Sequence, residues 1–379
     1  MTTSASTPTA NLEDRAHSPG KLILSGEHSV LYGQPALAMA IAQYTEVWFK
    51  PLDLGDGIRT AFDNLSSGQI YPLKLLSRFK SSLDHRFDQF KRGELAVHKI
   101  LTRPDDLAVY TLASILQERP TGTSPMPGFG ALHQFPFPGQ LGSRSTLPIG
   151  AGMGSSAAVV AAITVLIETL LNHPKTLEER SDRVRFCERL KHGKAGPIDA
   201  ATVVQGGLVF VGADGMGDAN ISKDHGLLTG DGWYSVLHGR PESSTGECVS
   251  QVRETHGSDS ALWESFGVCT HAFANTLRDG SDPSDVIKEN QRLLERVGVV
   301  PEATKAFVRD AEAVGGVAKI CGAGSVRGEN GGAVLVHLTD PEAMKALMAQ
   351  HPILTSNKLR LAPKGAAAGP APHGFEATS

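Results

Sequence analysis

The stretch at residues 147–158 reads Leu147-Pro148-Ile149-Gly150-Ala151-Gly152-Met153-Gly154-Ser155-Ser156-Ala157-Ala158, and an apolar run follows it. Three glycines at alternate positions let the backbone take positive φ and approach a ligand closely. The two serines stand at the predicted start of a helix, where free N–H groups and the helix dipole favour an anion. The stretch therefore predicts a loop that holds a phosphate group.

Three better-known patterns do not fit this stretch. A Walker loop needs a lysine after the glycines, and a dinucleotide loop needs glycine where Ser155 stands. The G-x-S-x-G elbow of hydrolases is also missing, because neither serine has a glycine two positions later. A plain glycine turn before a buried helix stays open as the alternative, so the interpretation depends on partners elsewhere in the chain.

Length and composition bound the class of protein. The chain has 379 residues, which favours two domains over one core. Hydrophobic residues make up 40% and charged residues 20%, as in ordinary globular proteins. With a formal net charge of −4 and no long Lys/Arg tract, the sequence argues against a nucleic-acid or membrane-surface partner. Its longest apolar run is shorter than the ~20 residues that span a bilayer.

The cysteines and the two ends give further expectations. Four cysteines lie far apart without a C-x-x-C pair, which predicts reduced thiols in a cytoplasmic protein and argues against zinc. Residues 1–17 lack the apolar segment of a secretory signal. Residues from about 362 to 379 are rich in Ala, Gly and Pro, which predicts a disordered tail.

Local patterns predict an α+β protein, because strands and helices are mixed without regular βαβ alternation. The Gly/Asp-rich range 212–232 predicts a boundary between an N-terminal domain, 1–228, and a C-terminal domain, 229–379. Strands are expected at 21–24, 45–49, 208–211, 317–320 and 333–338, loops and edge strands at 119–142, and helices at 156–171, 176–191, 301–314 and after 282 and 340.

Outside the glycine stretch, several titratable side chains are candidates for chemistry. Lys21 opens a predicted strand, and Glu27 and His28 occupy the turn after it. Glu188 borders the apolar stripe of a helix, where a carboxylate needs a partner or a cation. Asp199 stands between apolar neighbours after a glycine-interrupted turn. Each residue also has a plain structural interpretation: solvated lysine, polar turn, exposed carboxylate and helix N-cap.

A second glycine-rich loop, residues 319–328, carries Arg327 and is also typical of a β-hairpin connection. One chemistry uses all of these parts. Phosphoryl transfer needs a backbone cradle for phosphates, Mg²⁺ held by a hydroxyl and a carboxylate, a cation near the transferred group, and a carboxylate facing the attacking hydroxyl.

The sequence resembles the GHMP kinase superfamily and, within it, the mevalonate kinases. The resemblance rests on residues 18–38, 147–158 and 319–324, and on the E-x-x-x-H-G…I-D pattern over 188–199, all in the family's order. Glu27-His28 is the best pointer to mevalonate, because related phosphomevalonate kinases usually carry Glu-Tyr there.

The resemblance implies a two-lobed α+β fold. Its N-terminal lobe would be like the second domain of ribosomal protein S5 and its C-terminal lobe ferredoxin-like. ATP and mevalonate would meet in the cleft between them, and the 5-hydroxyl of mevalonate would be phosphorylated with Mg²⁺ as cofactor. A homodimer is a further expectation.

By position, the resemblance also implies roles for individual residues. Ser156 and Glu188 would bind Mg²⁺, and Asp199 would face the substrate hydroxyl as an ion pair with Lys21. Mevalonate would be bound by Lys21, Glu27, His28, Asp199 and Thr245, although Thr245 also lies in a capping-box pattern. The ATP phosphates would be held by Gly150, Ala151, Gly152, Met153, Gly154, Ser155 and Ser156.

Two departures from the family pattern concern the acceptor more than the kinase chemistry. Gly196 replaces the serine that often stands three residues before Asp199, and Ser325-Val326-Arg327 replaces glycines in the second loop. Arg327 is expected either to approach a phosphate or to lie in solvent. Two alternative functions stay open: another GHMP small-molecule kinase (phosphomevalonate, sugar or homoserine), and a non-catalytic regulator that binds ATP or a metabolite.

Overall fold

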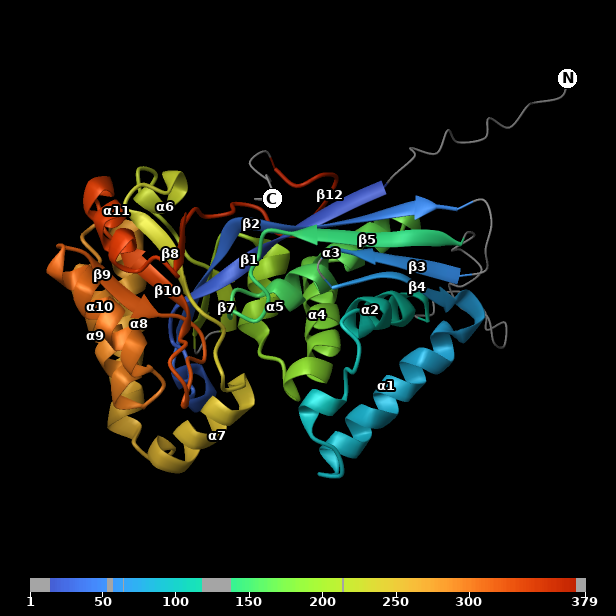
Figure 1. Cartoon of the computed structure of the whole chain (residues 1–379), viewed down its shortest axis with the longest axis horizontal. Coiled ribbons are helices and arrows are strands. Elements are labelled where there is room, and N and C mark those ends of the chain that lie inside the picture. Colours follow the sequence, from blue (N-terminus) through green and yellow to red (C-terminus); the bar gives the residue numbers. More distant parts are fainter. Residues whose placement is uncertain (1–13, 53–56, 64, 118–137, 213–214, 373–379) are drawn as a thin grey trace, which may run out of the picture.

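A computed structural model of the chain describes residues 14–52, 57–63, 65–117, 138–212 and 215–372. These residues form two sheets with helices packed against them, side by side along the long axis of the molecule (Figure 1). The predicted α+β class is therefore confirmed. The expectations for residues 1–13, for most of the loop range 119–142 and for the end of the tail lie outside the described residues.

The first sheet contains eight strands in the described part of the chain, in the order β12-β1-β2-β5-β3-β4, with β6 joining β2 to β7. Only β3 and β5 run parallel among these pairs. The strands are β1 (Asp14–Ser25), β2 (Ala36–Pro51), β3 (Gly57–Phe62), β4 (Ser66–Pro72), β5 (Gly139–Ser145), β6 (Leu208–Gly212), β7 (Gly215–Asp218) and β12 (Ala367–Ala368). β1 and β2 exceed the predicted strands 21–24 and 45–49 because each pairs with neighbours on both sides.

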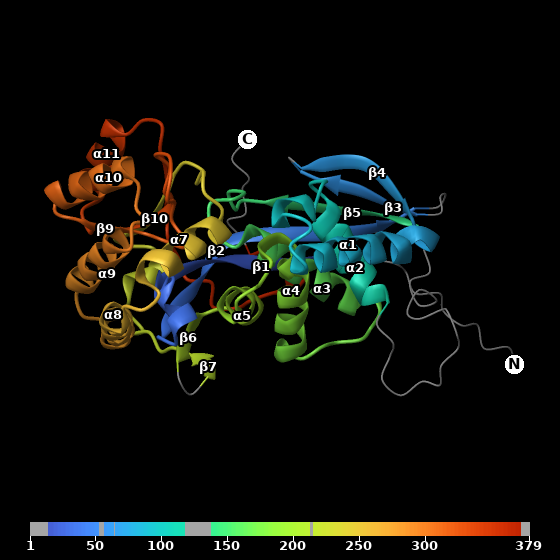
Figure 2. The same ribbon diagram turned by 90° about the horizontal axis from the view of Figure 1, so that it is seen from below.

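Helices cover one face of this sheet (Figures 1 and 2). They are α1 (Leu76–Lys91), α2 (Asp106–Leu116), α3 (Ser155–Leu170), α4 (Leu177–His192) and α5 (Pro197–Gln205), with short 3-10 turns at Ser29–Tyr32, Leu73–Leu75 and Val97–Lys99. α3 is central and almost entirely buried, because Ala, Val, Ile and Leu fill most of its length. Its observed start and that of α4 each lie within one residue of the predicted helices.

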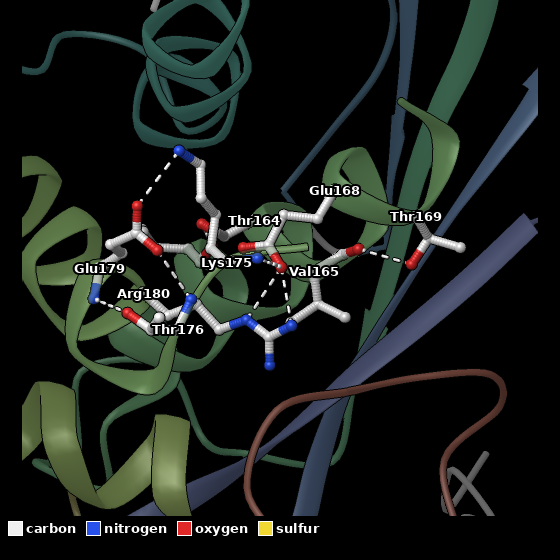
Figure 3. A network of polar contacts seen from close by, with 9 residues as sticks. Thr164, Val165, Glu168, Thr169, Lys175, Thr176, Glu179 and Arg180 are labelled. Atoms are coloured by element: carbon white, nitrogen blue, oxygen red, sulfur yellow. Dashed lines mark hydrogen bonds and ion pairs between the residues drawn. The ribbon is translucent and has the colours of Figure 1, made fainter. Parts of the chain in front are cut away.

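A polar network fixes the connection between α3 and α4 (Figure 3). Glu168, near the end of α3, accepts hydrogen bonds of 2.9 and 2.7 Å from Arg180 Nε and Nη2. Burial raises the pKa of Glu168, although Arg180 opposes the shift. Thr176 caps α4 in a reciprocal capping box with Glu179. The network holds the two helices in one register, so the start of α3 lies beside the end of α4.

The second sheet has the antiparallel order β11-β8-β10-β9. Its strands are β8 (Trp233–His238), β9 (Val317–Ile320), β10 (Gly332–His337) and β11 (Thr355–Lys358). The helices are α6 (Gly226–Thr229), α7 (Thr245–His256), α8 (Ser260–Asp279), α9 (Ser284–Arg296), α10 (Glu302–Ala313) and α11 (Pro341–Gln350). All strands and helices predicted for this half are found. No helix in the described ranges is long and apolar enough to cross a membrane.

The prediction of a disordered tail from about residue 362 is wrong for residues 362–372. The Ala362 N–H donates to Ala40 O at 2.8 Å, and β12 pairs with β1. A Cβ on Gly365 would lie 2.1 Å from Val204 O, so the small residues serve close packing rather than disorder. The chain thus returns to the first sheet.

The predicted domain boundary at residue 228 lies between β7 and β8. The division into domains 1–228 and 229–379 stays a prediction.

Several cysteine and histidine side chains are buried, and burial determines their protonation state. All four cysteines are buried and free. Burial lowers the pKa of four histidines below the usual value of 6.5, so their rings are neutral at neutral pH: His28, His225, His238 and His337.

Candidate active site

The glycine loop, residues 147–154, joins β5 to the start of α3. Its glycines Gly150, Gly152 and Gly154 have φ of 80°, 82° and 75°, a region that other residues rarely adopt. The Lys21 N–H donates to Met153 O at 3.0 Å, which ties the loop to β1. The loop thus presents the N-terminus of α3 with backbone that can approach an anion closely.

The second sheet holds the other side of this loop. The Ala333 N–H of β10 donates to Ala151 O at 3.2 Å, and a Cβ on Gly152 would lie 3.9 Å from Cys321 O. Elements of both sheets therefore position the glycine loop.

A hydroxyl and a carboxylate meet where α3 begins and α4 ends. Ser156 Oγ donates to Glu188 Oε2 at 2.9 Å, and His192 Nε2 lies 3.3 Å from the same oxygen. Burial alone would raise the pKa of Glu188, but His192 and its other neighbours lower it below the usual range. The carboxylate is therefore ionised at neutral pH.

This pair suits a hard divalent cation. Glu188 is 5% exposed, and its Oε1 is buried with no hydrogen-bond partner in the described part of the chain. Oxygen ligands of this kind fit Mg²⁺, which retains waters and binds substrate phosphates beside one or two protein groups. In the described ranges, no cluster of three or more His, Cys, Asp or Glu could hold a metal unaided.

Lys21 and Asp199 form an ion pair next to the glycine loop. Lys21 Nζ lies 3.0 Å from Asp199 Oδ1, with the lysine side chain 5% and the aspartate 41% exposed. Asp199 lies in the first turn of α5, whose N-cap is Gly196, so the alternative role of Asp199 as the N-cap is wrong. A buried cation therefore faces a carboxylate that remains open to a ligand.

Thr245 lines the same pocket as Glu188 and Asp199, although it comes from the second half of the chain. One pocket is lined by Glu188, Asp199 and Thr245, together with His192 and Lys194. The neighbouring residue Ser244, at the N-cap, makes the predicted capping box of α7, so Thr245 is the first helical residue and not the cap.

Arg327 is exposed to solvent, which agrees with one of its two expected roles, and its approach to a phosphate stays a prediction. Its Nη2 lies 3.2 Å from Glu247 Oε1, in an ion pair whose members are about half exposed. Glu247 is also the capping-box carboxylate of α7, and its hydrogen bonds with Ser244 and Arg327 lower its pKa to about 2. Arg327 therefore ties the second glycine-rich loop to the start of α7.

Glu27 and His28 contact the second glycine-rich loop and do not line the pocket around Asp199. His28 Nε2 donates to Ala323 O at 3.0 Å, because a carbonyl can only accept. Burial lowers the pKa of His28, although the bond to Ala323 and the charge of Glu27 oppose the shift. The neutral ring keeps Nδ1 as a buried acceptor, and none of the described residues donates to it.

Lys319 is a residue that the sequence analysis missed. Its Nζ lies 2.5 Å from Glu27 Oε1, and its side chain has no exposed surface. Burial opposes the charge, yet the pKa of Lys319 is raised because Cys321 and Glu27 lie beside it. Burial raises the pKa of Cys321 to about 11, so its thiol is uncharged at neutral pH. The sequence feature that could have identified Lys319 is its position within an otherwise apolar strand, Val317–Ile320.

Comparisons with known proteins agree with this geometry. A family model, GHMP kinases N terminal domain, matches residues 127–207, which include the glycine loop, Glu188 and Asp199. The mevalonate kinase of Pyrococcus abyssi is 26% identical over 323 residues, which are 82% of this chain and 85% of that protein.

Solved structures share the fold. Methanococcus jannaschii mevalonate kinase superposes with a TM-score of 0.70 at 18% identity and covers 93% of this chain and 99% of its own. The L. major mevalonate kinase, solved in complex with R-mevalonate, has a TM-score of 0.64 at 16% identity and covers 92% and 96%.

The chain thus carries a match to the GHMP kinases N terminal domain over residues 127–207 and shares its fold with solved mevalonate kinases. Within that family, the curated relatives that it matches over most of its length are mevalonate kinases.

Proposed function

We propose that this chain transfers the γ-phosphoryl group of ATP to the 5-hydroxyl of mevalonate. The observation that supports it best is the Lys21–Asp199 ion pair of 3.0 Å beside the glycine loop. A carboxylate that faces an acceptor and a buried cation at the transferred group are the parts that phosphoryl transfer needs.

In this proposal the chain's own groups position the reactants. The N–H groups of residues 150–156 hold the ATP phosphates at the start of α3. Ser156 and Glu188 hold Mg²⁺, which neutralises phosphate charge when bound. Asp199 orients the hydroxyl and takes its proton while the new P–O bond forms and the bond to ADP breaks. Lys21 stabilises the negative charge on Asp199 and on the transferred group.

The acceptor is assigned from Glu27, His28 and Thr245 together with the mevalonate kinases that this chain resembles. Glu27 Oε2 and His28 Nδ1 are both buried acceptors without partners in the described ranges, so they suit a ligand that brings hydroxyl donors. Action in the cytoplasm and as a homodimer belongs to the same proposal; the four free cysteines agree with a reducing compartment.

The test is Asp199→Asn, assayed for ADP release with mevalonate, phosphomevalonate, homoserine and galactose. The wild type is expected to prefer mevalonate, and the variant to lose about 10²- to 10⁴-fold in kcat with unchanged ATP affinity. Asp285→Asn, an exposed first-turn aspartate of α9, is the matched control and is expected to behave as wild type. Preference for another acceptor refutes the substrate, and ATP binding without any turnover favours the regulator.

A further inference from the structure

Lys319 and Glu27 form a buried ion pair that takes no part in the proposed phosphoryl transfer. Both side chains are at most 1% exposed, and they come from different sheets: Lys319 from β9 and Glu27 from the turn after β1. Desolvation of two charges offsets much of their attraction, so such a pair is a weak source of stability. Because Glu27 is one of the residues to which the acceptor is assigned in the proposed function, the pair points to a different use.

One segment of the second glycine-rich loop contacts two adjacent residues, Glu27 and His28. Lys319 binds Glu27 Oε1, and Ala323 O accepts a hydrogen bond from His28 Nε2 at 3.0 Å. Each contact occupies one polar atom of the side chain. The other, Glu27 Oε2 or His28 Nδ1, is buried without a partner among the residues that the structure describes. Two acceptors are thereby held in place for a donor that the described residues do not supply.

The backbone of His28 has an unfavourable conformation that the surrounding contacts must hold in place. His28 has φ 56° and ψ −48°, and a residue other than glycine rarely adopts positive φ. Such a conformation persists where the surrounding contacts determine it, and these sites are commonly ligand sites. Ala323 O is a contact of this kind, two residues after Cys321 on the same loop.

We propose that Lys319 is a positioning residue for the acceptor: by binding Glu27 Oε1 it aims Oε2 at a hydroxyl of the substrate. The inference rests on the proposed function, and it assigns to the second glycine-rich loop a role in acceptor binding. Lys319 has Glu27 as its charged partner and acts through it, so removing Lys319 is expected to affect acceptor KM far more than ATP KM.

The test is a double-mutant cycle of Lys319→Met and Glu27→Gln, with Lys358→Met on exposed β11 as the matched control. Lys319→Met is expected to raise acceptor KM at least tenfold and to leave ATP KM within twofold. In the Glu27→Gln background, the same substitution is expected to add less than twofold, because its target is already gone. Lys319→Arg, which keeps the charge, is expected to restore part of the loss.

Three results overturn the inference: an unchanged acceptor KM in Lys319→Met, an equal rise in ATP KM, or additive effects in the cycle. If Lys319→Met does not fold, the cycle is read from Glu27→Gln against the double variant, which buries no unpaired charge. A further rise in acceptor KM there also overturns it.

The acceptor panel separates this inference from the proposed function. If the wild type uses another acceptor, the substrate assignment fails and the KM comparison is made on that acceptor. If the wild type is silent on all four, both proposals fail, because Glu27 then has no acceptor to bind.

Discussion

Gly154→Ala tests whether the glycine loop and the Lys21–Asp199 pair act as one unit. Gly154 has φ +75°, and a Cβ there would lie 2.7 Å from Lys21 Cγ. Ordinary contact begins near 3.4 Å, so Lys21 must move by about 0.7 Å. Its side chain is 5% exposed and lies 3.0 Å from Asp199, which leaves little room to move without disturbing the pair.

The expected magnitudes differ for stability and for turnover. An alanine in the left-handed region costs about 1–2 kcal/mol. At ~2.1 cal/mol/K per residue, that cost lowers the Tm of a chain of this length by about 1–3 °C. Displacement of a catalytic group by up to about 1 Å can cost ~10²-fold in rate. We expect kcat to fall about 10²-fold while the protein stays folded.

The assay combines calorimetry with steady-state ADP release. Gly298→Ala is the matched control, because Gly298 has φ +79° and no atom lies within 4 Å of its added Cβ. It should lose the same 1–3 °C, by the same strain argument, and keep its kcat. The reasoning is refuted if Gly154→Ala keeps kcat within about threefold of wild type, or if Gly298→Ala loses kcat equally.

Three further predictions follow from the described contacts. Ser156→Ala removes the hydroxyl that meets Glu188, so half-maximal activity should need about 10- to 100-fold more free Mg²⁺, checked by titration at saturating ATP. Arg180→Met leaves the buried Glu168 unpaired and should lower the free energy of unfolding in urea by about 3 kcal/mol, whereas the exposed control Arg278→Met should cost under about 1 kcal/mol. The four buried histidines have folded pKa values below 6.5, so the unfolded state binds more protons as pH falls through 6.5, and Tm should drop from pH 7.5 to 5.5; a flat profile contradicts this.

Local chemistry explains which parts could be predicted from the sequence. The glycine loop, α3 and the capping boxes of α4 and α7 depend on residues that are neighbours in the chain, and their patterns identify them. The pairing of Lys21 with Asp199 spans 178 positions, and only the family resemblance implied it. Spacing along one chain contains no information about which turns of two different elements meet.

The tail shows how composition misleads where packing decides. Ala, Gly and Pro are typical of disorder because they bury little apolar surface. Here Gly365 fits against Val204 O, where a Cβ would be only 2.1 Å away, and β12 adds a strand to β1. Small residues permit either outcome, and the backbone of the neighbouring helix and strand determines which one occurs.

The contacts around Glu27 change how the family motifs are understood. Taken singly, the first motif carries Glu27 and His28, and the second glycine-rich loop looks like a hairpin connection. In the fold, Lys319 and Ala323 of that loop hold both residues, while Ala333, after the same loop, bonds the glycine loop at Ala151. The second glycine-rich loop therefore contacts Glu27 and His28, the acceptor residues of the proposed function, and the strand that follows it, β10, contacts the glycine loop. In the proposed role of Lys319, a small shift of this loop would change both contacts, and holding Glu27 in place would offset the cost of burying a lysine in β9.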